Sequence, residues 1–493
     1  MEIYFSDFFR VTPRDLERYG AFNISLVADL PLFLDPFLIF NSRKPHYKKL
    51  HRSMVRYLHF LHKKSRSQSL SPALLGSWYR FPEITENWLG FSETGNQGRG
   101  LGQKFASALH ENLGLLFSGP KGKQITKGVH LEKLCLIDEG VGKDNISDFT
   151  TNLIHGYLLD YTSKFARKHI DTKLRGTVVV RKARFNYQTE TWESRAYNLP
   201  LFQNHHVLLT PKELLTRDDT WINRNDLFED FDRLPEAIPN DHLREQISNY
   251  FLSLLPKPSK KRKRKKPTKA EHSHAVAQTL KRFPEMIDYY IRDKEVRGSQ
   301  ARAASNAKVA ASSELFVDQI KELRRLLETS TEFYKAEVNS YQAAHDRALY
   351  LKDVIENKGG HRLFYSKGKP IEREADLQVI YRFTWFRTSF DVGREANDGR
   401  GPVDYKITKG AIDKSLVEMK LASNSSLERN LQNQTAVYEK ASDAKRSVKI
   451  IICFSKAEQT RVDVILKRLK MLGDPSVVVI DARKDNKPSG SKA

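Results

Sequence analysis

The chain has 493 residues, with 83 Lys or Arg against 60 Asp or Glu, so its net charge at pH 7 is +23. This length predicts two or three domains, and a hydrophobic fraction of 39% excludes a wholly disordered chain. The longest apolar run, near residues 30–40, is about half of what a bilayer span needs, and two cysteines cannot build a disulfide framework. We therefore expect a cytoplasmic protein with no membrane partner that binds a polyanion such as nucleic acid.

Residues 1–255 predict a mixed α/β domain whose role is recognition, sensing or assembly. The pattern favours a helix at 47–63, a strand at 129–137, a helix at 147–165 and a hairpin of strands at 177–187 and 191–202. The first of these helices is rich in cations interleaved with aromatic residues. Lys48, Lys49 and Arg52 are candidates for contacts with a nucleic-acid backbone, and a solvated helix face is an equally good interpretation.

Residues 256–270 form a separate, strongly basic segment. Nine Lys or Arg lie between Lys257 and Lys269 with no acid among them, which leaves +14 for the rest of the chain. Like charges at this density repel, so we expect a flexible linker. Its run of cations is a candidate nucleic-acid-binding arm, with a nuclear-localisation patch as the alternative. The candidate residues are Lys260, Lys261, Arg262, Lys263, Arg264, Lys265 and Lys266.

Residues 271–360 predict a central helical arm, because apolar residues recur at helical spacing over much of this range, including residues 315–341. Gly359 and Gly360 follow the pattern and end it.

Residues 361–493 predict a second α/β domain with the clearest order of elements in the chain. We expect a helix at 371–386, strands at 389–395, 403–408 and 416–422, a helix at 427–441, a strand at 448–454, a helix at 458–472 and a strand at 477–480. The predicted order is α-β-β-β-α-β-α-β.

One strand of this domain carries charges where a core strand should be apolar. In residues 416–422 the period of two places Glu418 and Lys420 on one face, and Met419 on the other. Asp404 opens the preceding strand, and a short turn would bring its carboxylate beside Glu418. Two converging carboxylates form a hard-oxygen site suited to Mg²⁺, and a lysine near such a site can orient a water toward a phosphate. The alternative is a surface ion pair between Glu418 and Lys420.

These residues resemble the PD-(D/E)XK nuclease superfamily. The motif residues are Gly401-Pro402-Val403-Asp404 and Glu418-Met419-Lys420, in the expected αβββαβ order, with Val403 where the family name has proline. A branch of the family carries a Gln-x-x-x-Tyr helix after the third strand, which corresponds here to Gln434 and Tyr438.

The resemblance implies a role for each matched residue in a restriction-endonuclease-like core. Asp404, Glu418 and the Met419 carbonyl would bind Mg²⁺ (or Mn²⁺), and Lys420 would orient the attacking water. Glu374 would supply the acid of the first helix, as an outer or second-metal ligand, with Glu372 as the second choice. Gln434 and Tyr438 would position the substrate or the site.

The function that follows is metal-dependent hydrolysis of DNA, leaving a 5′-phosphate and a 3′-hydroxyl. By analogy, a nuclease domain behind a large unassigned front half fits a bacterial restriction or anti-phage defence protein, acting as a homo-oligomer or with a partner defence protein. The alternatives are a ribonuclease and a non-catalytic nucleic-acid-binding or scaffold protein with a nuclease-like fold.

Two further segments have a structural and a functional interpretation. The acid-rich stretch 136–148 suits helix capping, with Ser147 or Asp148 as the cap, or a second functional site. The glycine-rich stretch 95–102 lacks the ending of a phosphate-binding loop and favours a plain loop over a phosphate cradle.

Overall fold

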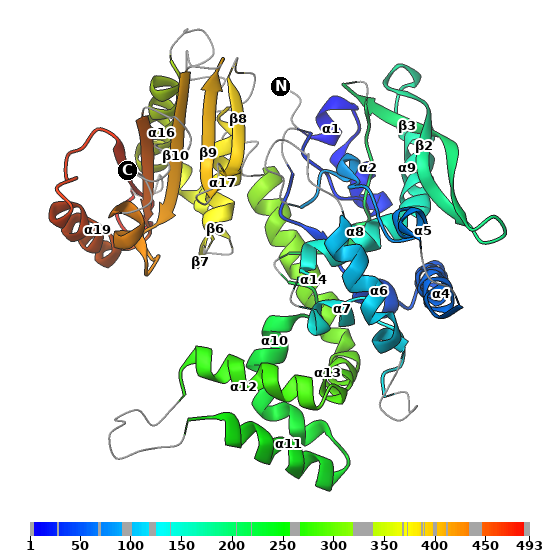
Figure 1. Cartoon of the computed structure of the whole chain (residues 1–493). Coiled ribbons are helices and arrows are strands. Elements are labelled where there is room, and N and C mark those ends of the chain that lie inside the picture. Colours follow the sequence, from blue (N-terminus) through cyan, green and yellow to red (C-terminus); the bar gives the residue numbers. More distant parts are fainter. Residues whose placement is uncertain are drawn as a thin grey trace.

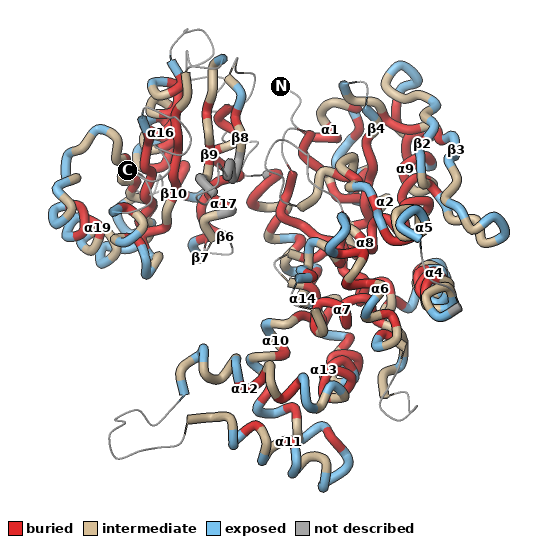
Figure 2. Tube along the Cα trace, viewed as in Figure 1, coloured by how far each residue is buried: buried red, intermediate tan, exposed pale blue. Residues whose placement is uncertain are grey.

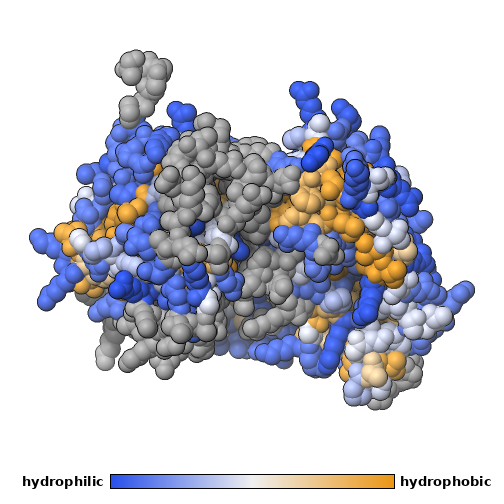
Figure 3. Space-filling model, turned by 90° about the horizontal axis from the view of Figure 1, so that it is seen from above, coloured by the Kyte–Doolittle hydropathy of each residue, from blue (hydrophilic) through white to orange (hydrophobic). Residues whose placement is uncertain are grey.

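The computed structural model shows a mixed α/β chain (Figure 1), which confirms the predicted fold class at this level. The residues that it describes form four separate sheets. It describes the whole chain apart from residues 1–3, 27–28, 68–70, 91–100, 118–124, 139, 204, 218, 257–266, 319–338, 367–368, 372, 386–387, 389, 398–401, 411–412, 433–445 and 488–493. No helix within the described ranges is long and apolar enough to cross a bilayer. The described surface seen in Figure 3 is mostly hydrophilic.

The N-terminal part combines helices with the expected hairpin. Strands β2 and β3 pair antiparallel, and α9 packs against both. Pro residues begin several of these helices at the first helical position, where the missing N–H costs nothing. The bounds are α1 (Phe5–Phe8), α2 (Pro13–Tyr19), β1 (Phe33–Leu34), α3 (Pro36–Phe40), α4 (Pro45–Ser67), α5 (Pro72–Trp78), α6 (Gln103–Phe117), α7 (Lys133–Ile137), α8 (Lys143–Leu153), α9 (His155–His169), β2 (Arg175–Asn186), β3 (Thr191–Phe202), β4 (His205–His206) and β5 (Leu215–Thr216).

The prediction of a strand at 129–137 is wrong, because the second half of this range forms the helix α7. The side chains of Leu134, Cys135 and Leu136 are all buried, so this short run is apolar on every side. A run of this kind fits a buried strand and a buried helix equally well, and local sequence cannot separate the two.

The expected helix at 147–165 is two helices, α8 and α9, which meet at Ile154. The predicted caps are also wrong. Helix α8 begins at Lys143 after Gly142, and the Ser147 hydroxyl instead accepts a hydrogen bond of 3.0 Å from the Leu34 amide.

A group of helices follows the N-terminal part. Helix α12 begins with a capping box in which Thr268 and Glu271 satisfy each other's backbone amides. Residues 257–266 of the linker and 319–338 of the predicted arm lie outside the described residues. The bounds are α10 (Arg224–Glu229), α11 (Asp241–Leu254), α12 (Lys269–Arg282), α13 (Glu285–Val296), α14 (Gly298–Ser313) and a π-helical turn (Glu314–Asp318).

The C-terminal part is built on a five-stranded sheet in the order β12-β11-β10-β9-β8. Strands β8, β9 and β10 are antiparallel neighbours, while β10, β11 and β12 are parallel. The bounds are α16 (Ser340–Asn357), β6 (Tyr365–Ser366), β7 (Lys369–Pro370), α17 (Glu374–Phe383), β8 (Asp391–Asn397), β9 (Pro402–Lys409), β10 (Asp413–Leu421), a helical stretch at 427–432, β11 (Arg446–Cys453), α19 (Lys456–Arg468) and β12 (Val477–Asp481).

Both faces of this sheet are covered. Ile450 and Ile452 of β11 enter a core shared with α16 and α17, whereas Ile451 and Cys453 enter a second core shared with α19. The buried stretch of β10 stands out in Figure 2. Parallel strands with two covered faces require a continuous apolar pattern, which residues 450–454 show after Lys449. From α17 onward the elements follow the order expected from the sequence.

Helix α17 is also where the N-terminal part meets the C-terminal part. The guanidinium of Arg217 forms a buried ion pair with Asp376 in the first turn of α17. The rings of Tyr4 and Phe383 lie 6.4 Å apart. The first turn of α17 is therefore held from outside the sheet as well as from within it.

Candidate active site

The candidate site lies where β9 and β10 run side by side. The last paired residues of this ladder are Tyr405 and Val417, so Asp404 comes next to Glu418. Side chains of adjacent strands at this position are neighbours on one face. The structure therefore brings together the two acids that the sequence predicts to converge.

The Asp404 carboxylate is held by three donors. Its Oδ1 accepts a hydrogen bond of 2.6 Å from Gln378 Nε2, and its Oδ2 accepts one of 2.6 Å from the Met419 amide. Lys420 Nζ lies 3.3 Å from the same Oδ2. Burial raises the pKa of Asp404, and the charge of Lys420 and the Met419 amide oppose that rise. The carboxylate is thus fixed in orientation before any ligand binds.

Lys420 joins the strand acid to the helix acid. Its Nζ lies 3.5 Å from Glu374 Oε2 in addition to its contact with Asp404. Burial lowers the pKa of this lysine, but the attraction of Asp404, Glu374 and Glu418 outweighs burial and leaves the pKa raised. Lys420 is therefore a partly buried ammonium at neutral pH, and the acid that contacts it from α17 is Glu374. Glu372, the second choice, lies outside the described residues.

Glu374 is positioned by the end of β10 and the loop after it. Its Oε1 accepts a hydrogen bond of 2.7 Å from Asn424 Nδ2 and a longer one of 3.4 Å from the Leu421 amide. This places the carboxylate at the N-terminus of α17 close to the strand that carries Glu418 and Lys420.

Glu418 is the least satisfied member of the cluster. It is 7% exposed, and no hydrogen-bond partner of its carboxylate lies among the described residues. Burial, together with the charges of Asp404 and Glu374, raises its pKa to about 7 against the opposing charges of Lys420 and Lys449. A buried carboxylate of this kind needs either a proton or a cation.

The donor set fits a hard divalent cation. Asp404 and Glu418 provide carboxylate oxygens on adjacent strands, and Mg²⁺ is commonly bound through one or two carboxylates. Among the described residues no group of three His, Cys, Asp or Glu side chains is arranged to hold a metal ion. The predicted ligands include three such side chains, Asp404, Glu418 and Glu374, and the structure does not show them grouped around one position for an ion.

Sequence reasoning missed two residues that position these acids. Gln378 lies four residues after Glu374, so the helical spacing that aims Glu374 at the sheet aims Gln378 there as well. Asn424 follows the end of β10 in a turn, and no local pattern points to it. Their partners are Asp404 and Glu374, respectively.

Several predicted residues are not brought to this cluster. Gln434 and Tyr438 lie outside the described residues, as does the basic run 260–266. Lys48, Lys49 and Arg52 are exposed on α4, at the opposite side of the molecule from the C-terminal sheet in Figure 1.

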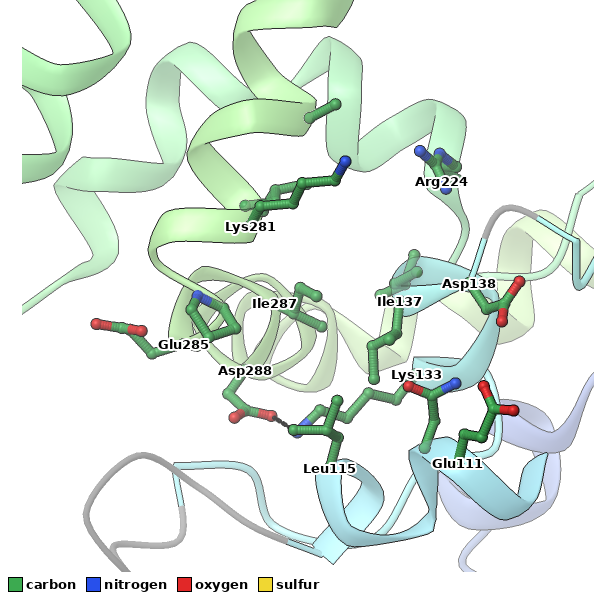
Figure 4. A pocket seen from close by; sticks show the side chains of 15 residues that line it. Glu111, Leu115, Lys133, Ile137, Asp138, Arg224, Lys281, Glu285, Ile287 and Asp288 are labelled. Atoms are coloured by element: carbon green, nitrogen blue, oxygen red, sulfur yellow. Dashed lines mark hydrogen bonds and ion pairs between the residues drawn. The ribbon is translucent and has the colours of Figure 1, made fainter. Parts of the chain in front are cut away.

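A cavity of about 650 Å³ lies among α6, α7, α10, α12 and α13, apart from the carboxylate cluster (Figure 4). Lys133 Nζ and Asp288 Oδ1 form an ion pair of 2.5 Å in its wall. Apolar side chains such as Ile137 and Ile287 alternate with charges of both signs around it. In the acid-rich stretch beside it, Asp138 accepts a hydrogen bond of 2.8 Å from the Gly140 amide, which closes a turn.

Two parts of the chain are similar to known protein families. Residues 10–223 match a family described as a domain of unknown function, DUF8370, and residues 340–456 match a second one, DUF8371. The second match begins at the start of α16 and contains Glu374, Asp404, Glu418 and Lys420. No curated protein and no solved structure matches the chain.

Proposed function

We propose that the chain is a metal-dependent nuclease that hydrolyses phosphodiester bonds of DNA at the cluster of Asp404, Glu418 and Lys420. The observation that carries this proposal is the convergence of a buried carboxylate, Glu418, with a partly buried carboxylate and a partly buried lysine, Asp404 and Lys420, on adjacent strands. Such groups destabilise a fold unless a ligand or a reaction uses them. The order of elements and the two motifs support membership of the PD-(D/E)XK superfamily, with a restriction-endonuclease-like core.

Asp404, Glu418 and the Met419 carbonyl would hold Mg²⁺ or Mn²⁺, and Glu374 would add a carboxylate from α17. A divalent cation bound there supplies Lewis-acid activation of the phosphate. The hydrogen bonds from Gln378 to Asp404 and from Asn424 to Glu374 keep both carboxylates oriented.

Lys420 provides the positive charge that the reaction needs beside the two carboxylates. Its ammonium, charged at neutral pH, can orient the attacking water and stabilise the negative charge that develops on the phosphate. In-line displacement would then leave a 5′-phosphate and a 3′-hydroxyl, as in the family.

The test is a cleavage panel of supercoiled, linear, single-stranded and modified DNA and of RNA, with Mg²⁺ or EDTA. We expect DNA to be cleaved in Mg²⁺ and not in EDTA. Lys420→Ala and Asp404→Ala should each reduce the rate of cleavage by about 10²-fold or more. Lys467→Ala, which removes an exposed lysine of α19, is the matched control. Undiminished cleavage in both site variants would refute this site.

Two other outcomes identify the alternatives. DNA binding that is equal in Mg²⁺ and EDTA without any nicking indicates a non-catalytic binding or scaffold protein. Cleavage of RNA alone indicates a ribonuclease.

A further inference from the structure

Helix α4 (Pro45–Ser67) belongs to a segment without acidic residues. Between Asp35 and Glu83 the chain has no Asp or Glu, although Lys and Arg recur from residue 43 to residue 66. An ordinary surface helix mixes both signs, because pairs of opposite charge four residues apart stabilise it. Because α4 has no acids, its cations cannot form such pairs within the helix.

Six cations of α4 share one face of the helix, which we name the α4 basic stripe. Positions 48, 49, 52, 56, 63 and 66 fall within an arc of about 100° at 3.6 residues per turn, and all six are exposed. The opposite face is core, where Tyr57, Leu58 and Leu61 are at most 2% exposed. The stripe consists of Lys48, Lys49, Arg52, Arg56, Lys63 and Arg66.

The charges of the stripe are not neutralised by any acid that the structure describes. Two lysines outside the stripe form ion pairs, Lys44 with Glu213 and Lys64 with Glu190. None of the six stripe residues has an ion pair with a residue that the structure describes. The guanidinium of Arg56 instead stacks on Tyr187 at the end of the β2–β3 hairpin, 3.9 Å from the ring centroid.

We propose that the α4 basic stripe binds the phosphate backbone of nucleic acid, as a contact separate from the C-terminal cluster. The inference rests on the proposed function only for the identity of the polyanion. From residue 49 to residue 66 the helix is about 26 Å long, at 1.5 Å per residue. A row of cations along a straight element can follow successive phosphates without reading bases.

The buried apolar face distinguishes this role from membrane binding. A helix that lies on a bilayer inserts its apolar face among the lipids. In α4 that face is packed into the protein core, so only the charged face can meet a partner. Electrostatic contact with a polyanion is the interaction that remains.

The test measures DNA binding as a function of salt in EDTA, which separates binding from cleavage. If the six cations each neutralise one phosphate, affinity for duplex DNA falls about 10³-fold between 50 and 200 mM salt. Replacing Lys49, Arg52, Lys63 and Arg66 with Gln removes four contacts, so the loss of affinity over the same salt step should be about 10²-fold smaller than in the wild type.

The control variant changes the net charge by the same amount at other exposed sites. It replaces Arg14, Arg18, Arg233 and Arg282 with Gln. We expect this control to keep the salt dependence of the wild type. A stripe variant whose salt dependence equals that of the control would overturn the inference, as would binding to anionic lipid vesicles with no binding to DNA.

Cleavage assays on the same proteins keep the two proposals distinguishable. The stripe variant should raise KM on long DNA and leave kcat unchanged, because α4 lies away from the carboxylate cluster. If the wild type binds DNA through the stripe but never cleaves it, the proposed nuclease function fails and this inference stands. If the wild type cleaves DNA and the stripe variant has an unchanged KM, the proposed nuclease function stands and this inference fails.

Discussion

The backbone amide of Met419 donates a hydrogen bond of 2.6 Å to the carboxylate of Asp404. This bond joins the first acid of the site to the residue between Glu418 and Lys420, so the two strands share one rigid polar edge. Charge-assisted hydrogen bonds of this length are stronger than neutral ones. The geometry of the site is therefore set by the sheet itself, and α17 adds Glu374 and Gln378 to it.

Gln378 should matter for activity although it carries no charge. Replacing it with Met keeps the volume but removes the donor to Asp404 Oδ1. Loss of such an orienting bond typically reduces metal affinity or activity by about 10- to 100-fold. The measurement is the Mg²⁺ dependence of cleavage, with Gln342→Met on the exposed side of α16 as the control. Equal activity of the two variants would contradict the positioning role.

Glu418 should make stability fall as pH rises in metal-free buffer. Its folded-state pKa of about 7 lies above the ordinary value of 4.5, so the folded state binds more protons than the unfolded state between these pH values. Stability therefore decreases across this window, by about 3 kcal/mol in total. Urea unfolding at pH 5 and pH 8 should show that Glu418→Gln removes this decrease. A parallel pH dependence in both proteins would contradict the prediction.

Mg²⁺ should stabilise the folded chain through the carboxylate cluster. A ligand at 100 times its Kd stabilises the state that binds it by about 2.7 kcal/mol. We expect thermal unfolding of the wild type to shift upward with Mg²⁺ relative to EDTA, and Asp404→Asn to show no shift. Asn keeps the shape of the side chain while removing its charge, so an equal shift in this variant would place the metal elsewhere.

The buried ion pair between Arg217 and Asp376 should hold α17 against the N-terminal part. Breaking such a pair by removing one partner costs about 3–5 kcal/mol, because a charge is left in the interior. We expect Arg217→Met to lower the free energy of unfolding, measured in urea, by about 3–5 kcal/mol. The double variant Arg217→Met with Asp376→Leu should recover most of the loss. Single and double variants of equal stability would contradict this account.

The sequence by itself determined the strand alternation that carries the site and the order of the elements around it. The faces of Glu418, Lys420 and Met419 follow from the period of a strand, and Asp404 follows from a short connection between neighbours. These are local regularities of the backbone, so they can be read without the fold. The basic character of α4 could also be recognised from the sequence, because it too is a local feature.

Only the tertiary structure decided which groups hold these residues and which charges remain without an ion pair. The contacts of Asn424 with Glu374 and of Arg217 with Asp376 join segments 50 and 159 residues apart. The stretch at 129–137 became partly helical because its apolar run at 134–137 has no period of its own. The α4 stripe became a candidate surface only once its apolar face proved to be buried. Each of these outcomes depends on packing between distant segments, which local sequence does not encode.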